Sequence, residues 1–127
     1  MLTGSKATAM LPVMDMKRAR KFYEEALRLP ASEAVEGGET HYDAGGTDIA
    51  LYPRTTPNKS DHTALTFEVR DLDGEMKDLR SRGVKFEDYD VPGLKTTSGV
   101  ATTARERCAW FRDPEGNILC LHQETKH

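Results

Sequence analysis

Apolar residues alternate with other residues in two short segments of the chain, one in each half. A period of two is typical of a β-strand that buries one face. Each segment then reaches an aspartate, Asp15 or Asp71, and a run in which apolar residues recur with helical spacing. Because a carboxylate there accepts hydrogen bonds from the first free N–H groups of a helix, the pattern predicts a strand and a capped helix, twice. The alternating positions are Ala9, Leu11 and Val13, and then Leu65, Phe67 and Val69.

Each predicted helix has one apolar face and a residue that ends it. Pro30 ends the first helix, because proline lacks the N–H that a helix needs. Gly83 ends the second, because glycine readily adopts the left-handed backbone conformation at that point. The apolar faces comprise Ala19, Phe22, Ala26 and Leu29 in the first helix and Leu72, Met76 and Leu79 in the second.

Further strands are predicted after each helix, separated by turns such as Gly37-Gly38 and Gly45-Gly46. The chain is therefore predicted to be a single α+β domain, residues 1–127, with two βαβββ modules at about 5–54 and 61–124 and a linker at about 55–60. We expect each sheet to pack a helix on one face and the other faces to form an open cup. The predicted strands are Ser32–Glu36, Glu39–Ala44, Asp48–Tyr52, Val84–Asp90, Ala109–Arg112 and Asn117–His122, and Pro92–Arg105 is predicted to be a polar loop.

Net charge, the length of apolar stretches and cysteine spacing indicate which kinds of partner this protein does not bind. The formal net charge is −3, which argues against a protein that binds the nucleic-acid backbone. The longest apolar stretch, Met10–Met14, contains a proline and is much shorter than the ~20 residues of a membrane-spanning helix. Cys108 and Cys120 form neither a disulfide framework nor a CxxC pair. We therefore expect a cytoplasmic protein with no membrane or nucleic-acid partner.

Several stretches together resemble a known family. They are Leu11-Pro-Val-Met-Asp15 with Phe22-Tyr23-Glu24, His62-Thr-Ala-Leu65, Arg82-Gly83-Val84 and Trp110-Phe-Arg-Asp-Pro-Glu-Gly-Asn-Ile-Leu119. The chain thus resembles the vicinal oxygen chelate superfamily, which contains glyoxalase I, extradiol dioxygenases, fosfomycin-resistance enzymes and bleomycin-binding proteins. The resemblance covers about Thr8 to Leu121 and implies a cup-shaped, glyoxalase-like fold. It does not choose among the activities, because one fold hosts many chemistries.

The resemblance also implies where a metal would bind. Enzymes of the superfamily hold a divalent metal with ligands from the first and last strands of each module, positions that fall here at Thr8, Ala50, Ala64 and Cys120. Alanine has no ligand atom, and only cysteine among these four is a usual ligand. No cofactor is therefore expected. The alternative is a divalent metal at an atypical site around His62, which stands two residues before Ala64 and so on the same strand face.

Strand alternation indicates which side chains face the predicted cup. A lone tryptophan, Trp110, is suited to stack on a flat ligand, although the same residue can simply pack the sheet or a dimer interface. If Asp113–Asn117 is a five-residue loop, Trp110 faces Cys120 on the next strand. Cys120 is more commonly a buried, inert cysteine than a nucleophile. The residues predicted to contact a ligand are Thr8, Met10, Tyr52, His62, Trp110 and Cys120.

The stretch Lys95–Ser98 offers a cation and three hydroxyl groups to an anion, although exposed loops commonly have this composition.

Three functions remain open at this point. The first is a metal-free protein that binds an aromatic or polycyclic compound in the cup. The second is a divalent-metal-dependent lyase or dioxygenase with a site around His62. The third is a metal-free enzyme with His62 or His122 as its base, since histidine titrates near neutral pH; the alternative is that both are hydrogen-bonded strand residues. The resemblance also implies a homodimer, because family members with short modules complete their cups through a partner.

Overall fold

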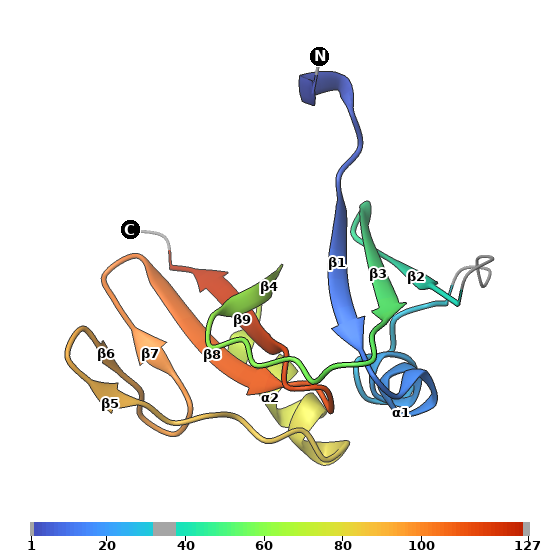
Figure 1. The fold of residues 1–127 in the computed structure, drawn as a ribbon. Helices are drawn as coiled ribbons and strands as arrows, with labels where there is room; N and C mark the ends of the chain where they lie inside the picture. Colours follow the sequence, from blue (N-terminus) through green and yellow to red (C-terminus); the bar gives the residue numbers. More distant parts are fainter. Residues whose placement is uncertain (1, 32–37, 126–127) are drawn as a thin grey trace. The chain divides into compact units, whose positions relative to one another are not determined.

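A mixed sheet forms from the first strand and the last two strands of the first half of the chain. The computed structural model describes residues 2–31 and 38–125, which divide into unit 1, residues 1–59, and unit 2, residues 60–127. In unit 1 the sheet order is β1-β3-β2, with β1 parallel and β2 antiparallel to β3 (Figure 1). The elements are the 3-10 turn η1 (Leu2–Gly4), β1 (Thr8–Val13), α1 (Met16–Lys21), the π-helical segment η2 (Phe22–Ala26), β2 (Thr40–Ala44) and β3 (Thr47–Pro53).

The predicted alternation in β1 is confirmed. Leu11 and Val13 are each 1% exposed, whereas Met10, directly before Leu11, is 49% exposed. Asp15 caps α1 as predicted, because its Oδ1 accepts a hydrogen bond from Arg18 N at 3.1 Å. The predicted strand Ser32–Glu36 and the first residue of the Gly37-Gly38 turn lie outside the described residues.

The first helix differs from the prediction in its second half. Residues Phe22–Ala26 form a π-helical segment, in which Leu27 N donates to Phe22 O at 3.0 Å. This wider turn changes which side chains face the sheet. Tyr23, rather than Phe22, is fully buried and stacks on Tyr42 with ring centroids 5.9 Å apart.

Unit 2 contains a four-stranded sheet and a longer helix. The sheet order is β4-β9-β8-β7, with β4 parallel to β9 and β8 antiparallel to both of its neighbours. Leu72, Met76 and Leu79 of the helix are buried, as the pattern predicted, and Gly83 takes a positive φ of 89° after the helix ends. The elements are β4 (Thr63–Glu68), α2 (Leu72–Ser81), β5 (Asp90–Val91), β6 (Leu94–Lys95), β7 (Ala101–Thr102), β8 (Glu106–Arg112) and β9 (Ile118–Glu124).

The predicted strand at 84–90 and loop at 92–105 are both wrong in part. Between residues 84 and 89 the backbone pairs with the sheet only at a bridge between Phe86 and Phe111. Beyond it, the β5–β6 hairpin and β7 replace a plain loop. Hydrogen bonds to the Asp88 side chain explain the change, because its Oδ1 atom accepts from Thr96 Oγ1 and from Gly99 N, each at 2.8 Å.

The turn between β8 and β9 sets the register of the two strands. The buried Asp113 Oδ1 accepts from Glu115 N at 2.9 Å and from Asn117 N at 2.8 Å, and Oδ2 accepts from Asn117 Nδ2 at 2.8 Å. The resulting five-residue loop pairs Trp110 with Cys120, which confirms the predicted register.

Among the described residues, no helix is long and apolar enough to cross a membrane.

Candidate functional site

One face of the unit 2 sheet is turned away from α2. Gln123 and Arg107 point towards the helix, since Leu72 N donates to Gln123 Oε1 at 2.7 Å and Arg107 forms an ion pair with Asp73 at 2.9 Å. Side chains one residue along each strand point the other way. We call this surface the helix-free face of unit 2. It comprises Thr66, Glu68, Glu106, Cys108, Trp110, Cys120 and His122.

His122 is held between two carboxylates on this face. Its Nε2 lies 2.7 Å from Glu106 Oε2 in a hydrogen bond, and its Nδ1 lies 2.6 Å from Glu68 Oε1. The second contact is an ion-pair distance without hydrogen-bond alignment, and Nδ1 is buried. The hydrogen bond to Glu106, followed by the charge of Glu68, raises the pKa of His122 despite the opposing effect of burial. The two carboxylates therefore favour the imidazolium, which is an acid rather than a base.

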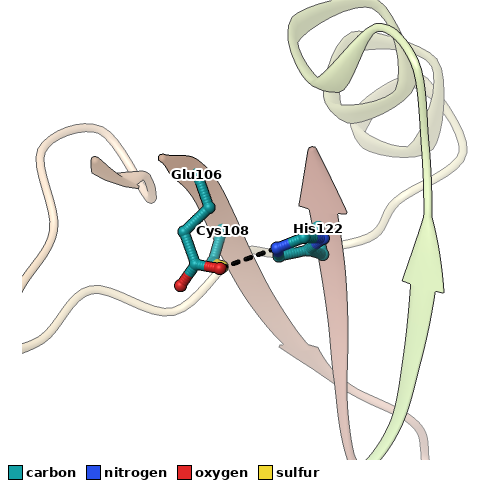
Figure 2. Close-up of side chains that lie close together, drawn as sticks. All are labelled: Glu106, Cys108 and His122. Atoms are coloured by element: carbon teal, nitrogen blue, oxygen red, sulfur yellow. Dashed lines mark hydrogen bonds and ion pairs between the residues drawn. The ribbon is translucent and has the colours of Figure 1, made fainter. Parts of the chain in front are cut away.

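Cys108 completes a compact group of donor atoms. It lies directly opposite His122 in the β8–β9 ladder. One ligand atom each from Glu106, Cys108 and His122 lies within 4.8 Å of the others (Figure 2). Burial and the charge of Glu106 raise the pKa of the Cys108 thiol. Imidazole, thiolate and carboxylate together form a ligand set that suits zinc and similar ions.

The sequence analysis identified His122 but missed Glu106 and Cys108. Its predicted strand began at Ala109, whereas β8 begins at Glu106. Extending the alternation of Trp110 back by two and four residues would have placed both missed residues on the helix-free face.

Trp110 lies in the middle of the same face. Its half-buried ring packs edge-on against Tyr89, with centroids 5.7 Å apart and an interplanar angle of 81°. Its partner across the ladder, Cys120, is 4% exposed. Burial raises the pKa of Cys120 to about 12, so this thiol is protonated at neutral pH and is a poor nucleophile.

His62 lies outside the strand that was expected to carry it. β4 begins at Thr63, and the side chain of His62 is 77% exposed. Its Nδ1 lies 3.0 Å from Ser60 Oγ. The β4–β9 ladder has a register shift between Thr63 and Leu65, so regular alternation does not extend to residue 62. Its role as a ligand or base stays a prediction.

Unit 1 has its own polar group on the face away from its core. Thr8 Oγ1 donates to Asp48 Oδ2 at 2.9 Å, and His41 Nδ1 lies 3.0 Å from the same carboxylate. His41 Nε2 contacts Glu39 Oε1 at 3.1 Å. Hydrogen bonds to Asp48 and then Glu39 raise the pKa of His41, and the hydrogen bond from Thr8 is the main cause that lowers the pKa of Asp48.

The other two predicted ligand contacts in unit 1, Met10 and Tyr52, lie on strands β1 and β3. Met10 pairs with Ala50, and Tyr52 pairs with Pro12. Alternation therefore places both on the same face as Thr8 and Asp48. The sequence analysis did not select His41, although its pairing with Ala50 puts it on this face as well.

A separate groove of about 490 Å³ lies beside α2, away from the helix-free face of unit 2. Lys95 and Ser98 line it, together with Arg80 and Arg107. Both guanidinium groups already have partners, because Arg107 forms two hydrogen bonds with Asp73 and Arg80 donates to Ser98 O at 3.2 Å. The two arginines are therefore less available to bind an anion than the residues that line the groove suggest.

Comparison with known proteins identifies the family. The model of the glyoxalase/bleomycin resistance protein/dioxygenase superfamily matches residues 7–121, which include both strand–helix segments and the β8–β9 turn. The chain belongs to this superfamily. This confirms the resemblance inferred from the sequence, and the α+β, glyoxalase-like fold class is confirmed by the matching structures.

Three proteins that are similar to this chain cover nearly all of its length. The uncharacterised protein YraH of Bacillus subtilis is 30% identical, over 89% of this chain and 93% of YraH. A glyoxalase/bleomycin resistance protein of Streptomyces sp. CB03234 is 28% identical with a TM-score of 0.69, over 94% of this chain and all of its own. TnmS3, an antibiotic binding protein of the same organism, is 23% identical with a TM-score of 0.70, over 98% and 99% of the two chains.

The residues at the superfamily's metal positions do not suit a metal. Ala50 and Ala64 carry no ligand atom. Thr8 donates its hydroxyl proton to Asp48, and the Cys120 thiol contacts Leu121 O at 3.3 Å and resists ionisation. The cluster of Glu106, Cys108 and His122 uses none of these four positions.

Proposed function

We propose that this superfamily member binds a planar aromatic or polycyclic compound, with Trp110 as the main contact and without a metal at the superfamily's usual positions. The observation that carries the proposal is the half-buried Trp110 ring on the helix-free face of unit 2. Tyr89 supports one edge of the ring. A rigid, amphipathic indole contributes large apolar contact area at low entropic cost.

The relatives support a binding role. TnmS3 is described as an antibiotic binding protein, and a second matching structure is described as a glyoxalase/bleomycin resistance protein. Both cover nearly the whole chain. Antibiotics of this kind are small molecules, which a tryptophan-bearing sheet face can accept without catalysis.

The remaining parts of the proposal concern context. We propose a single domain in which Thr8, Met10, Tyr52 and His62 add contacts to the ligand, and a homodimer as the assembly. Two buried, free cysteines are compatible with a cytoplasmic location. The net charge of −3 supports a protein that does not bind nucleic acid.

Tryptophan fluorescence tests the proposal directly, because Trp110 is the only tryptophan. Bleomycin and a panel of planar polycyclic compounds would be titrated while quenching and thermal shift are followed together. Trp110→Ala should weaken binding of any hit by ~2–4 kcal/mol, the range of a binding hot spot. Trp110→Phe keeps most of the apolar body and should retain much of the affinity.

The two variants also separate binding from folding. Unfolding of each variant without ligand measures any damage to the sheet. If hits raise the melting temperature equally in the wild type and in Trp110→Ala, the tryptophan is structural and the proposed contact is wrong.

A further inference from the structure

We propose that Glu106, Cys108 and His122 form a binding site for one divalent transition-metal ion, best suited to Zn²⁺. The ligands would be a carboxylate oxygen, the thiolate sulfur and the Nε2 atom, with a fourth position left for water or a bound molecule. This site goes beyond the proposed function, because stacking on Trp110 does not require it.

The sheet brings the three ligands together from two adjacent strands. Cys108 and His122 are a registered pair of β8 and β9, and Glu106 is two residues before Cys108 on the same face. Their ligand atoms lie within 4.8 Å of one another. Ligands of one tetrahedral zinc ion, with bonds of about 2.0–2.3 Å, stand roughly 3.5 Å apart. Small side-chain rotations therefore suffice to close the site.

Glu68 supplies the feature that usually accompanies a metal-binding histidine. Its Oε1 lies 2.6 Å from Nδ1 of His122, on the opposite side of the ring from Glu106. A carboxylate at one ring nitrogen orients the imidazole and directs the other nitrogen to the metal. Glu68 is therefore a positioning residue.

The charges of the group also favour a cation. Without a metal, a proton on His122 offsets the carboxylates of Glu68 and Glu106. A bound Zn²⁺ would take the place of that proton at Nε2 and would release the thiol proton of Cys108. Binding should therefore release protons and should weaken as the pH falls.

Cobalt(II) is the probe for this site, because a cobalt–thiolate bond produces a charge-transfer absorption and tetrahedral cobalt absorbs strongly in the visible. The wild-type protein should bind one Co²⁺ per chain with both signals, and Zn²⁺ should displace it. Cys108→Ser should lose the charge-transfer band, whereas the matched variant Cys120→Ser should keep it. His122→Ala should abolish tight binding, whereas His41→Ala in unit 1 should not.

The positioning role of Glu68 has its own test. Glu68→Gln should weaken Co²⁺ binding by roughly 10–100-fold and keep the charge-transfer band. Glu75→Gln on the exposed surface of α2 should change neither. Circular dichroism and melting of each variant show that it is folded. A band that survives Cys108→Ser, or is lost only in Cys120→Ser, would overturn the site, as would a folded wild-type protein that binds no Co²⁺ or Zn²⁺ at micromolar concentration.

The proposed metal site and the proposed ligand contact at Trp110 can be tested independently of each other. Trp110→Ala should keep the cobalt spectrum, and aromatic compounds titrated with EDTA present should still quench Trp110. A cobalt signal that disappears in Trp110→Ala with the fold intact would overturn the assignment of the three ligands.

Discussion

His122 and His41 share one arrangement at the scale of single residues. Each imidazole has a carboxylate near both ring nitrogens, Glu68 and Glu106 for His122, and Asp48 and Glu39 for His41. Hydrogen bonds to Asp48 and Glu39 raise the pKa of His41, and the hydrogen bond to Glu106 together with the charge of Glu68 raises the pKa of His122. Paired charges of this kind link protonation to folding, because the folded chain holds the proton more tightly than the unfolded chain.

His122 should therefore make stability depend on pH. A folded-state pKa above the ordinary value of 6.5 gives a contribution that is fully present below pH 6.5 and is lost as the pH rises through the raised value. Urea unfolding with EDTA present, at several pH values from 6 upwards, measures the free energy of unfolding. We expect the wild type to lose stability relative to His122→Gln as the pH rises. Parallel curves for the two proteins would contradict this prediction.

The π-helical segment shows how one element can override a residue pattern. Helical spacing predicted Phe22 on the buried face, whereas the π turn buries Tyr23 instead. The buried Tyr42 hydroxyl beneath it donates to Glu24 at 2.7 Å, and Glu24 pairs with Arg20 at 2.8 Å. The wider turn thus allows an aromatic stack and satisfies the buried hydroxyl group.

The β8–β9 turn is the element on which both proposed sites depend. Its register places Trp110 opposite Cys120 and Cys108 opposite His122. Asp113→Ala removes the acceptor of three hydrogen bonds, from Glu115 N, Asn117 N and Asn117 Nδ2. Because these donors would be left unpaired in a buried turn, the variant should lose about 3 kcal/mol of unfolding free energy.

Denaturant unfolding measures that loss, with Asp90→Ala in the exposed β5–β6 hairpin as the matched control. Asp90 is exposed, and its substitution should cost less than about 0.5 kcal/mol. Equal stabilities of the two variants would show that the Asp113 hydrogen bonds do not hold the turn.

At the scale of the whole molecule, the proposal of a single domain requires units 1 and 2 to unfold together. Trp110 reports on unit 2 alone, whereas far-UV circular dichroism reports on the strands and helices of both units. We expect the two unfolding curves in urea to superimpose, as a single cooperative transition requires. The midpoint should also rise with protein concentration, because dissociation accompanies unfolding of a homodimer.

Two separate results would contradict this expectation. A fluorescence transition that is complete before the circular dichroism changes would show that the units unfold independently. A midpoint that does not depend on concentration, together with a monomer mass in sedimentation, would remove the homodimer.

The sequence by itself determined the two strand–helix segments, their capping aspartates and the family. These features rest on local patterns, since strand alternation, helix caps and the Asp113–Asn117 turn depend on residues close in the chain. The register of Trp110 with Cys120 followed from the same turn. The absence of ligand atoms at Ala50 and Ala64 could likewise be read from the sequence alone.

Tertiary structure decided the rest, because the deciding contacts join distant residues. The pairing of β4 with β9 brings Glu68 to His122, which is 54 positions later in the chain. Because β8 begins at Glu106, Glu106 and Cys108 join His122 as possible metal ligands. Asp88 reaches Thr96 and Gly99 and so turns a predicted strand and loop into a hairpin. No local pattern contains such distances, and the cluster of Glu106, Cys108 and His122 therefore became visible only once the strands were paired.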